Sequence, residues 1–154
     1  MTNHLLSNPE ATATVLSILT AVIVGFFGYR QNNDRHRREY TLNVLAPLLA
    51  NDRLFKTHDA VVNYRIKNLQ PDYATVQTNE REDILQLLGY YEFLSAAFMR
   101  GDLDRRTVLS QRKSTFRYAF ETLKPFIDAR RTLLSNNRVY CDFEEFVTRY
   151  CRQC

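Results

Sequence analysis

Residues 84–99 have the sequence ILQLLGYYEFLSAAFM, and this stretch decides the fold. Apolar side chains fall on nearly every side of a helix built from it, which is typical of a helix buried inside a protein. Before it, Asn79 and Glu82 have the spacing of a capping box, and Gly101 follows it as a C-terminal stop. The sequence therefore predicts a buried central helix that ends near residue 100.

Helical periodicity continues on both sides of this central helix. Apolar spacing predicts one helix over about 52–69, a long one that Asp104 caps, and a last one after residue 141. Pro47 is expected to kink or break an earlier helix that runs to about residue 50. No segment shows sustained period-two alternation, so we expect an all-α bundle of about four to five helices.

An uncharged stretch of 19 residues, ATATVLSILTAVIVGFFGY, occupies residues 11–29. As a helix it would be about 28 Å long, enough to cross a bilayer's hydrocarbon core. We therefore expect a transmembrane helix at 11–29, a short external N-terminus at 1–10 and a cytoplasmic helical domain at 30–154. The lipid bilayer is then one expected partner.

The charges beside this stretch indicate an orientation. Arg30, Arg35, Arg37 and Arg38 follow it, and no Lys or Arg precedes it. Cytoplasmic flanks retain positive charge, so the domain is expected on the cytoplasmic side of a bacterial inner membrane, with the N-terminus outside. A cleaved signal peptide would need its basic residues before the apolar run, so we expect an uncleaved anchor.

A second membrane span at Ile84–Met99 is the alternative reading of the central stretch. Its 16 residues would cover about 24 Å, and Glu92 lies near the centre. A charge there costs roughly 2.5 kcal/mol or more, so length and charge both favour a buried helix of the domain.

Glu92 and His58 are the two polar residues predicted inside the core. A carboxylate in an apolar helix is paired, protonated or functional, and Arg117 or Arg130 are the expected ion-pair partners. Chemistry at Glu92 is the one enzymatic alternative. His58 is predicted to be a hydrogen-bonded core histidine, because no second histidine or acid has metal-ligand spacing with it.

The three cysteines are Cys141, Cys151 and Cys154. They are only weak metal ligand candidates, because a structural zinc site needs four ligands, and reduced thiols are expected. The sequence contains no glycine-rich phosphate loop, no G-x-S-x-G and no nucleotide-binding fingerprint. We therefore predict a non-enzymatic protein without a cofactor.

Arginine outnumbers lysine 17 to 4, and residues 30–154 hold 16 of the 17 acids. Arginine suits planar pairing with carboxylates and phosphates. Two partners follow as hypotheses: a protein or signal bound by the helical domain, or a nucleic acid or nucleoprotein bound by an arginine surface. Scattered arginines paired with acids would favour the first hypothesis, and a clustered arginine face would favour the second.

Small residues recur every four positions in the apolar stretch, at Ala13, Ser17, Ala21 and Gly25. They share one side of a helix, where small side chains let two backbones approach closely. The pattern predicts a homo-oligomer formed through this helix.

Three segments carry a family resemblance: the apolar stretch with its arginine-rich continuation, LLGYYEFLS, and FRYAFETLKPFIDARR with VYCDFEEF. Together they resemble an uncharacterised bacterial and phage family of membrane-anchored helical proteins. The resemblance implies an anchored α-helical domain and no catalytic residue. The layout is also similar to small membrane effectors of antiphage defence, which implies a membrane-acting role in defence.

Overall fold

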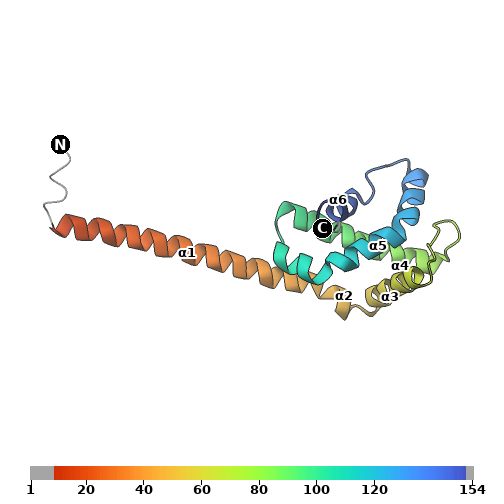
Figure 1. Cartoon of the computed structure of the whole chain (residues 1–154), viewed down its shortest axis with the longest axis horizontal. Coiled ribbons are helices and arrows are strands. Elements are labelled where there is room, and N and C mark those ends of the chain that lie inside the picture. Colours follow the sequence, from red (N-terminus) through yellow and green to blue (C-terminus); the bar gives the residue numbers. More distant parts are fainter. Residues whose placement is uncertain (1–8, 152–154) are drawn as a thin grey trace. The chain divides into compact units, whose positions relative to one another are not determined.

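The computed structural model describes residues 9–151, and every regular element in that range is a helix (Figure 1). The all-α prediction is therefore confirmed for the described residues. The chain divides into two compact units after His36, and each is treated by itself below. The helices are α1 (Pro9–Leu45), α2 (Pro47–Ala50), α3 (Asp52–Ile66), α4 (Thr78–Arg100), α5 (Arg105–Leu134) and α6 (Cys141–Tyr150).

Helix α4 is the centre of the second unit, as the sequence predicts. It contacts α3, α5 and α6, so the stretch 84–99 is enclosed by protein on several sides. This position explains why the stretch is apolar around its circumference. The buried apolar side chains of α4 are Ile84, Leu87, Leu88, Tyr91, Leu94, Ala97 and Phe98.

Aromatic rings join α6 to the rest of this core. Phe143 of α6 stacks on Tyr91 of α4 with ring centroids 5.1 Å apart. Phe146 lies edge-on to Phe98 at 4.7 Å and to Phe116 of α5 at 5.0 Å. Such pairs bury large apolar areas in fixed geometries, so they determine where α6 begins relative to α4.

The helix ends follow the sequence prediction in part. Asp104 caps α5 by accepting a hydrogen bond from the Thr107 N–H at 2.8 Å. Gly101 ends α4 with φ +82°, in the left-handed region that favours glycine. The predicted capping box at Asn79 is wrong, because α4 already begins at Thr78 and its N-cap, Gln77, makes no side-chain cap bond.

The last turns of α1 belong to the second unit and attach to it through polar contacts. Thr41 is fully buried, and its Oγ1 donates to the Arg37 carbonyl and accepts from the Asp104 N–H, both at 2.7 Å. The Tyr90 hydroxyl of α4 donates to the Val44 carbonyl at 3.0 Å. The helix is then interrupted before Pro47, as expected of a proline that cannot donate a backbone hydrogen bond.

The prediction of a transmembrane helix at 11–29 is wrong. Among the described residues, no helix is long and apolar enough to cross a membrane. The uncharged stretch includes threonine, serine, glycine and tyrosine, which add little hydrophobicity. The orientation inferred from the flanking charges depended on this span.

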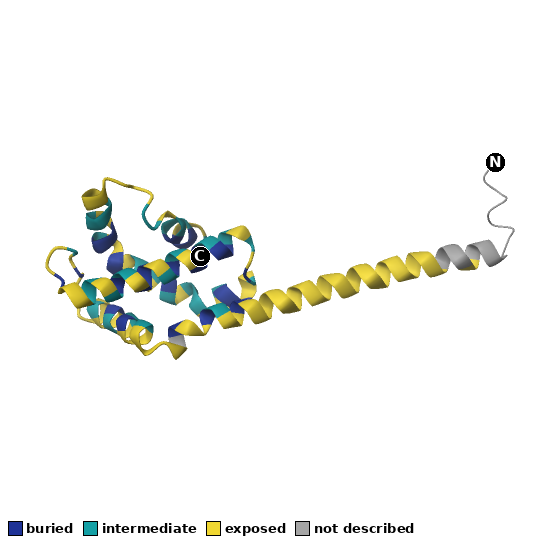
Figure 2. Cartoon of the chain, turned by 180° about the vertical axis from the view of Figure 1, so that it is seen from behind, coloured by how far each residue is buried: buried dark blue, intermediate teal, exposed yellow. Residues whose placement is uncertain are grey.

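The first unit consists of α1 up to His36, and its described side chains are exposed (Figure 2). Inside it, the Ser17 hydroxyl donates to the Ala13 carbonyl at 2.9 Å, so this serine satisfies its polar group within its own helix. Arg30 and Arg35 are also exposed on this part of α1, and Arg37 and Arg38 are exposed at the start of the second unit.

Candidate functional site

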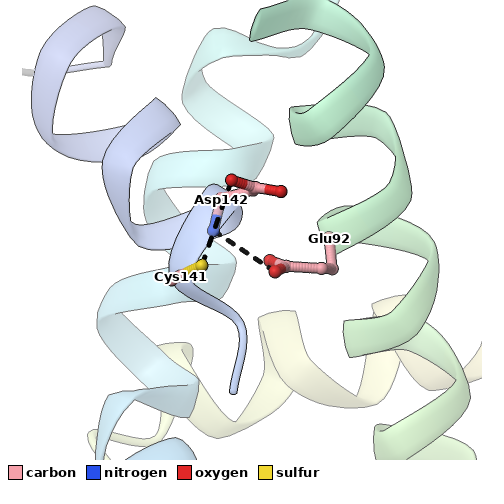
Figure 3. A group of neighbouring side chains, drawn as sticks. All are labelled: Glu92, Cys141 and Asp142. Carbon is pink, nitrogen blue, oxygen red and sulfur yellow. Dashed lines mark hydrogen bonds between the residues drawn. The ribbon is translucent and has the colours of Figure 1, made fainter. Parts of the chain in front are cut away.

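Glu92 of α4 lies at the first turn of α6 (Figure 3). Its Oε2 accepts from the Phe143 N–H at 2.8 Å, and its Oε1 accepts from the Asp142 N–H at 3.2 Å. The N-cap residue of α6, Tyr140, has φ +58° and makes no side-chain cap bond. A carboxylate from another helix therefore satisfies two of the free N–H groups at the start of α6.

The ion-pair partners expected for Glu92 are not the groups that it meets. No ion pair among the described residues joins it to Arg117 or Arg130, and Arg117 instead lies 3.8 Å from Glu121, Nε to Oε1. Spacing along the sequence pointed to Arg117 and Arg130 of α5 as partners of Glu92. This spacing carried no information about the free N–H groups that the first turn of α6 presents to Glu92.

Burial and hydrogen bonding act in opposite directions on the Glu92 carboxyl. Burial raises its pKa above the ordinary value, because an anion loses solvation inside the protein. The N–H groups of Phe143 and Asp142 lower the pKa, the Asp142 carboxylate raises it, and Arg131 lowers it. The net direction is upward, so this half-buried carboxyl holds its negative charge less readily than an exposed glutamate.

A thiol and a second carboxylate lie beside Glu92. The ligand atoms of Glu92, Cys141 and Asp142 all lie within 4.8 Å of one another (Figure 3). Cys141 is exposed, and its Sγ lies 4.0 Å from Asp142 Oδ1. Burial, with the charges of Asp142 and Glu92, raises the pKa of the Cys141 thiol. These three residues, called the α4–α6 cluster below, combine the sulfur and oxygen donors that Zn²⁺ accepts.

Only one of the three cysteines, Cys141, belongs to this cluster among the described residues. Cys151 is a buried free thiol at the end of α6, where burial raises its pKa to about 11. Cys154 lies outside the described residues. The group of possible metal ligands in the described residues is instead a mixed set in which Cys141 joins two carboxylates. The sequence did not indicate this set, because Glu92 and Cys141 are 49 positions apart.

Arg131, which the sequence analysis missed, holds the connection that leads into α6. Its Nε donates to the Val139 carbonyl at 2.9 Å, and its Nη1 lies 2.8 Å from Glu144 Oε2. The arginine thus ties the last turn of α5 both to the loop and to α6. The sequence signal that could have identified Arg131 is a basic residue in the last turn of a helix that precedes a short loop.

His58 of α3 faces α4 and is half-buried. Its Nδ1 lies 2.9 Å from the Tyr91 hydroxyl, so the two side chains share a hydrogen bond. Burial lowers the pKa of His58, and the positive charge of Arg112 lowers it further. Both effects favour the neutral form of this histidine.

The arginines of the second unit are distributed over several helices and many face acids. Arg65 lies 2.6 Å from Glu121, joining α3 to α5, and Arg149 lies 2.9 Å from Glu145 within α6. The arginines in such ion pairs are Arg53, Arg65, Arg100, Arg117, Arg131 and Arg149.

The chain belongs to the family described as Domain of unknown function (DUF4760), which matches residues 15–150. The match confirms the predicted membership of an uncharacterised family, and it extends over most of both compact units. Comparison with curated proteins and with solved structures finds no match to this chain.

Proposed function

Since membership of this family supplies no activity, we propose from the geometry that the chain is a non-enzymatic assembly protein. Helix α1 associates with α1 of other copies, and the assembly presents several helical bundles formed by residues 37–151 to a protein partner. The observation that carries this proposal is the exposed apolar surface of α1 in the first unit.

The exposed surface of α1 is unusually large and apolar. Eight large apolar side chains between residues 18 and 29 are 53–74% exposed. Proteins that act as monomers rarely expose contiguous apolar patches beyond a few hundred Å², and larger patches mark interaction sites. The eight residues are Ile18, Leu19, Val22, Ile23, Val24, Phe26, Phe27 and Tyr29.

The shape of this surface favours a second copy of the same helix as its occupant. At 100° per residue, the large side chains spread over about 240° of the circumference, and Ser17, Ala21 and Gly25 fall in the remaining arc. A Cβ atom built on Gly25 would meet nothing within 4 Å, so the chain itself leaves this arc open. The bulky face of α1 in one copy can therefore pack against the small-residue face of α1 in another copy.

The distribution of the large side chains also bears on the number of copies. A single partner covers only one side of a helix, and it would leave part of the 240° arc exposed. Because burying a large apolar side chain contributes about 1.5–3 kcal/mol, each further helix that covers an exposed side adds stability. We therefore propose a bundle of more than two α1 helices.

The helical bundle formed by residues 37–151 is the proposed partner-binding part. Carboxylates of this unit already face six of its arginines. At these six positions phosphate groups would have to displace the carboxylates, which weakens the electrostatic attraction that nucleic-acid binding depends on. The arrangement supports a protein partner. The expected role in antiphage defence stays a prediction.

Light scattering on the full chain tests the proposed assembly by measuring the mass of the particle. We expect several chains per particle, and a smaller particle for the double variant Ile23→Gln with Phe27→Gln. Phe93→Gln is the matched control, because Phe93 is 48% exposed but lies on α4. A particle of one chain, or a mass that α1 and α4 variants change equally, would overturn the proposal.

The small-residue face gives a second test of the same interface. Gly25→Leu adds bulk where two backbones are proposed to approach, so it should weaken association despite making α1 more apolar. Ile18→Leu and Val24→Leu, on the bulky face, should matter much less. If Gly25→Leu strengthens association instead, hydrophobicity alone drives it and the small residues have no special part.

A further inference from the structure

We propose that the α4–α6 cluster of Glu92, Cys141 and Asp142 binds one thiophilic divalent cation of the Zn²⁺ class. The site is independent of the proposed assembly through α1, because all three residues belong to the second unit. Bound metal would join the middle of α4 to the first turn of α6.

The core holds the ligand-bearing segments in place. Tyr91 precedes Glu92, and Phe143 follows Asp142; both rings are fully buried and stack on each other at 5.1 Å. Glu92 and Asp142 are therefore each adjacent to a residue that packing fixes. A site whose backbone is already positioned loses little conformational entropy when it binds its ion.

The distances suit a metal after small side-chain movements. Ligand atoms around a tetrahedral Zn²⁺ lie roughly 3.5 Å apart, given bonds of about 2.0–2.3 Å. The three ligand atoms lie within 4.8 Å of one another, so a contraction of about 1 Å is needed. The exposed Cys141 side chain is free to supply most of it by rotation about its Cα–Cβ bond.

The hydrogen bonds of Glu92 are compatible with this role. Its Oε2 keeps the shorter bond to the Phe143 N–H at 2.8 Å, while Oε1 has the longer bond to Asp142 at 3.2 Å. A carboxylate oxygen has two lone-pair sites, so Oε1 can accept that bond and face a cation. The N–H groups would then orient the ligand, as groups behind a metal ligand commonly do.

The cluster brings together groups that can carry negative charge. Two carboxylates and one thiol converge there, and the contact that the structure gives the Asp142 carboxylate is the Cys141 thiol at 4.0 Å. Arg131 is close, but its guanidinium pairs with Glu144 and the Val139 carbonyl. A divalent ion would offset the mutual repulsion of the three groups in their charged forms.

The donor set selects the class of ion. Thiolate is a soft ligand that Mg²⁺ and Ca²⁺ avoid, while Zn²⁺ binds sulfur and carboxylate oxygen together. Three protein ligands leave one position of a tetrahedral ion for water or a partner's side chain.

Cobalt titration of the full chain tests the site, because Co²⁺ replaces Zn²⁺ and gives a thiolate-to-cobalt absorption band. The chain carries Cys154→Ser, so that this terminal thiol does not contribute. We expect one equivalent of Co²⁺ per chain, with a band that Zn²⁺ abolishes by competition. Cys141→Ser should remove the band, and Asp142→Asn should weaken binding about tenfold or more.

Two controls separate binding at the cluster from other outcomes. Glu145→Gln changes a carboxylate of α6 outside the cluster and should leave the titration unchanged. Zn²⁺ should raise the melting temperature of the Cys154→Ser chain and leave that of the Cys141→Ser variant unchanged. The melting transition of the Cys141→Ser variant itself shows that this variant still folds. A titration without a thiolate band, or a band that persists in Cys141→Ser, would overturn the proposal.

Discussion

Removal of the Glu92 carboxylate should weaken the attachment of α6 to the core. Glu92→Ala leaves the N–H groups of Asp142 and Phe143 without their acceptor. A buried donor left unsatisfied costs about 1–3 kcal/mol, and the cost for Asp142 should be near the lower end because the exposed Cys141 lets water approach. Loss of a negative charge at a helix N-terminus adds about 0.3–1 kcal/mol.

These contributions are partly offset, because the variant no longer buries a carboxylate whose pKa burial has raised. We expect Glu92→Ala to lower the free energy of unfolding by about 2–4 kcal/mol. Glu92→Gln keeps one oxygen as an acceptor, so it should cost only about 1 kcal/mol.

Urea unfolding followed by circular dichroism measures both variants, with a chelator present so that no bound metal contributes. Glu145→Ala is the control, because its ion pair with Arg149 is exposed and should contribute no more than about 0.5 kcal/mol. If Glu92→Ala costs no more than this control, then the carboxylate does not cap α6 in solution and the reasoning fails.

Three further substitutions test other contacts of the second unit. Thr41→Val removes the buried acceptor of the Asp104 N–H and should cost about 1–3 kcal/mol in urea unfolding, whereas Thr41→Ser should retain most of the stability. Gly101→Ala places a Cβ at φ +82° and should cost about 1–2 kcal/mol, while an alanine at the helical Gly89 should not destabilise. For His58, the folded-state pKa is lowered, so the unfolded chain binds the proton more readily and stability falls as pH drops through about 6.5. His58→Gln should flatten this part of the melting-temperature profile between pH 7.5 and 5, and an unchanged slope would contradict the assignment.

The sequence was informative where local chemistry determines structure. The apolar circumference of 84–99 predicted a buried helix, and Asp104 and Gly101 predicted the start of one helix and the end of another. Each of these signals depends on residues within a few positions. Pro47 likewise produced the expected interruption, because its missing N–H acts on its own helix.

Contacts between residues far apart in the sequence could not be predicted from such local signals. Glu92 was identified as the unusual residue, but its role depends on the first turn of α6, about 50 positions later. Aromatic packing between α4 and α6 creates that proximity, and periodicity alone does not specify which rings will meet. The predicted span at 11–29 rested on the length of the stretch and its lack of charge, and no described helix is long and apolar enough to cross a membrane.

Sedimentation velocity, comparing the full chain with a chain that begins at Arg37, tests the proposed assembly most directly. The account predicts that the full chain sediments as a particle of several copies whose size depends on concentration. The shorter chain lacks the exposed apolar residues 18–29 and should sediment as a single copy. A full chain that sediments as one copy, or a shorter chain that assembles equally well, would contradict the central claim.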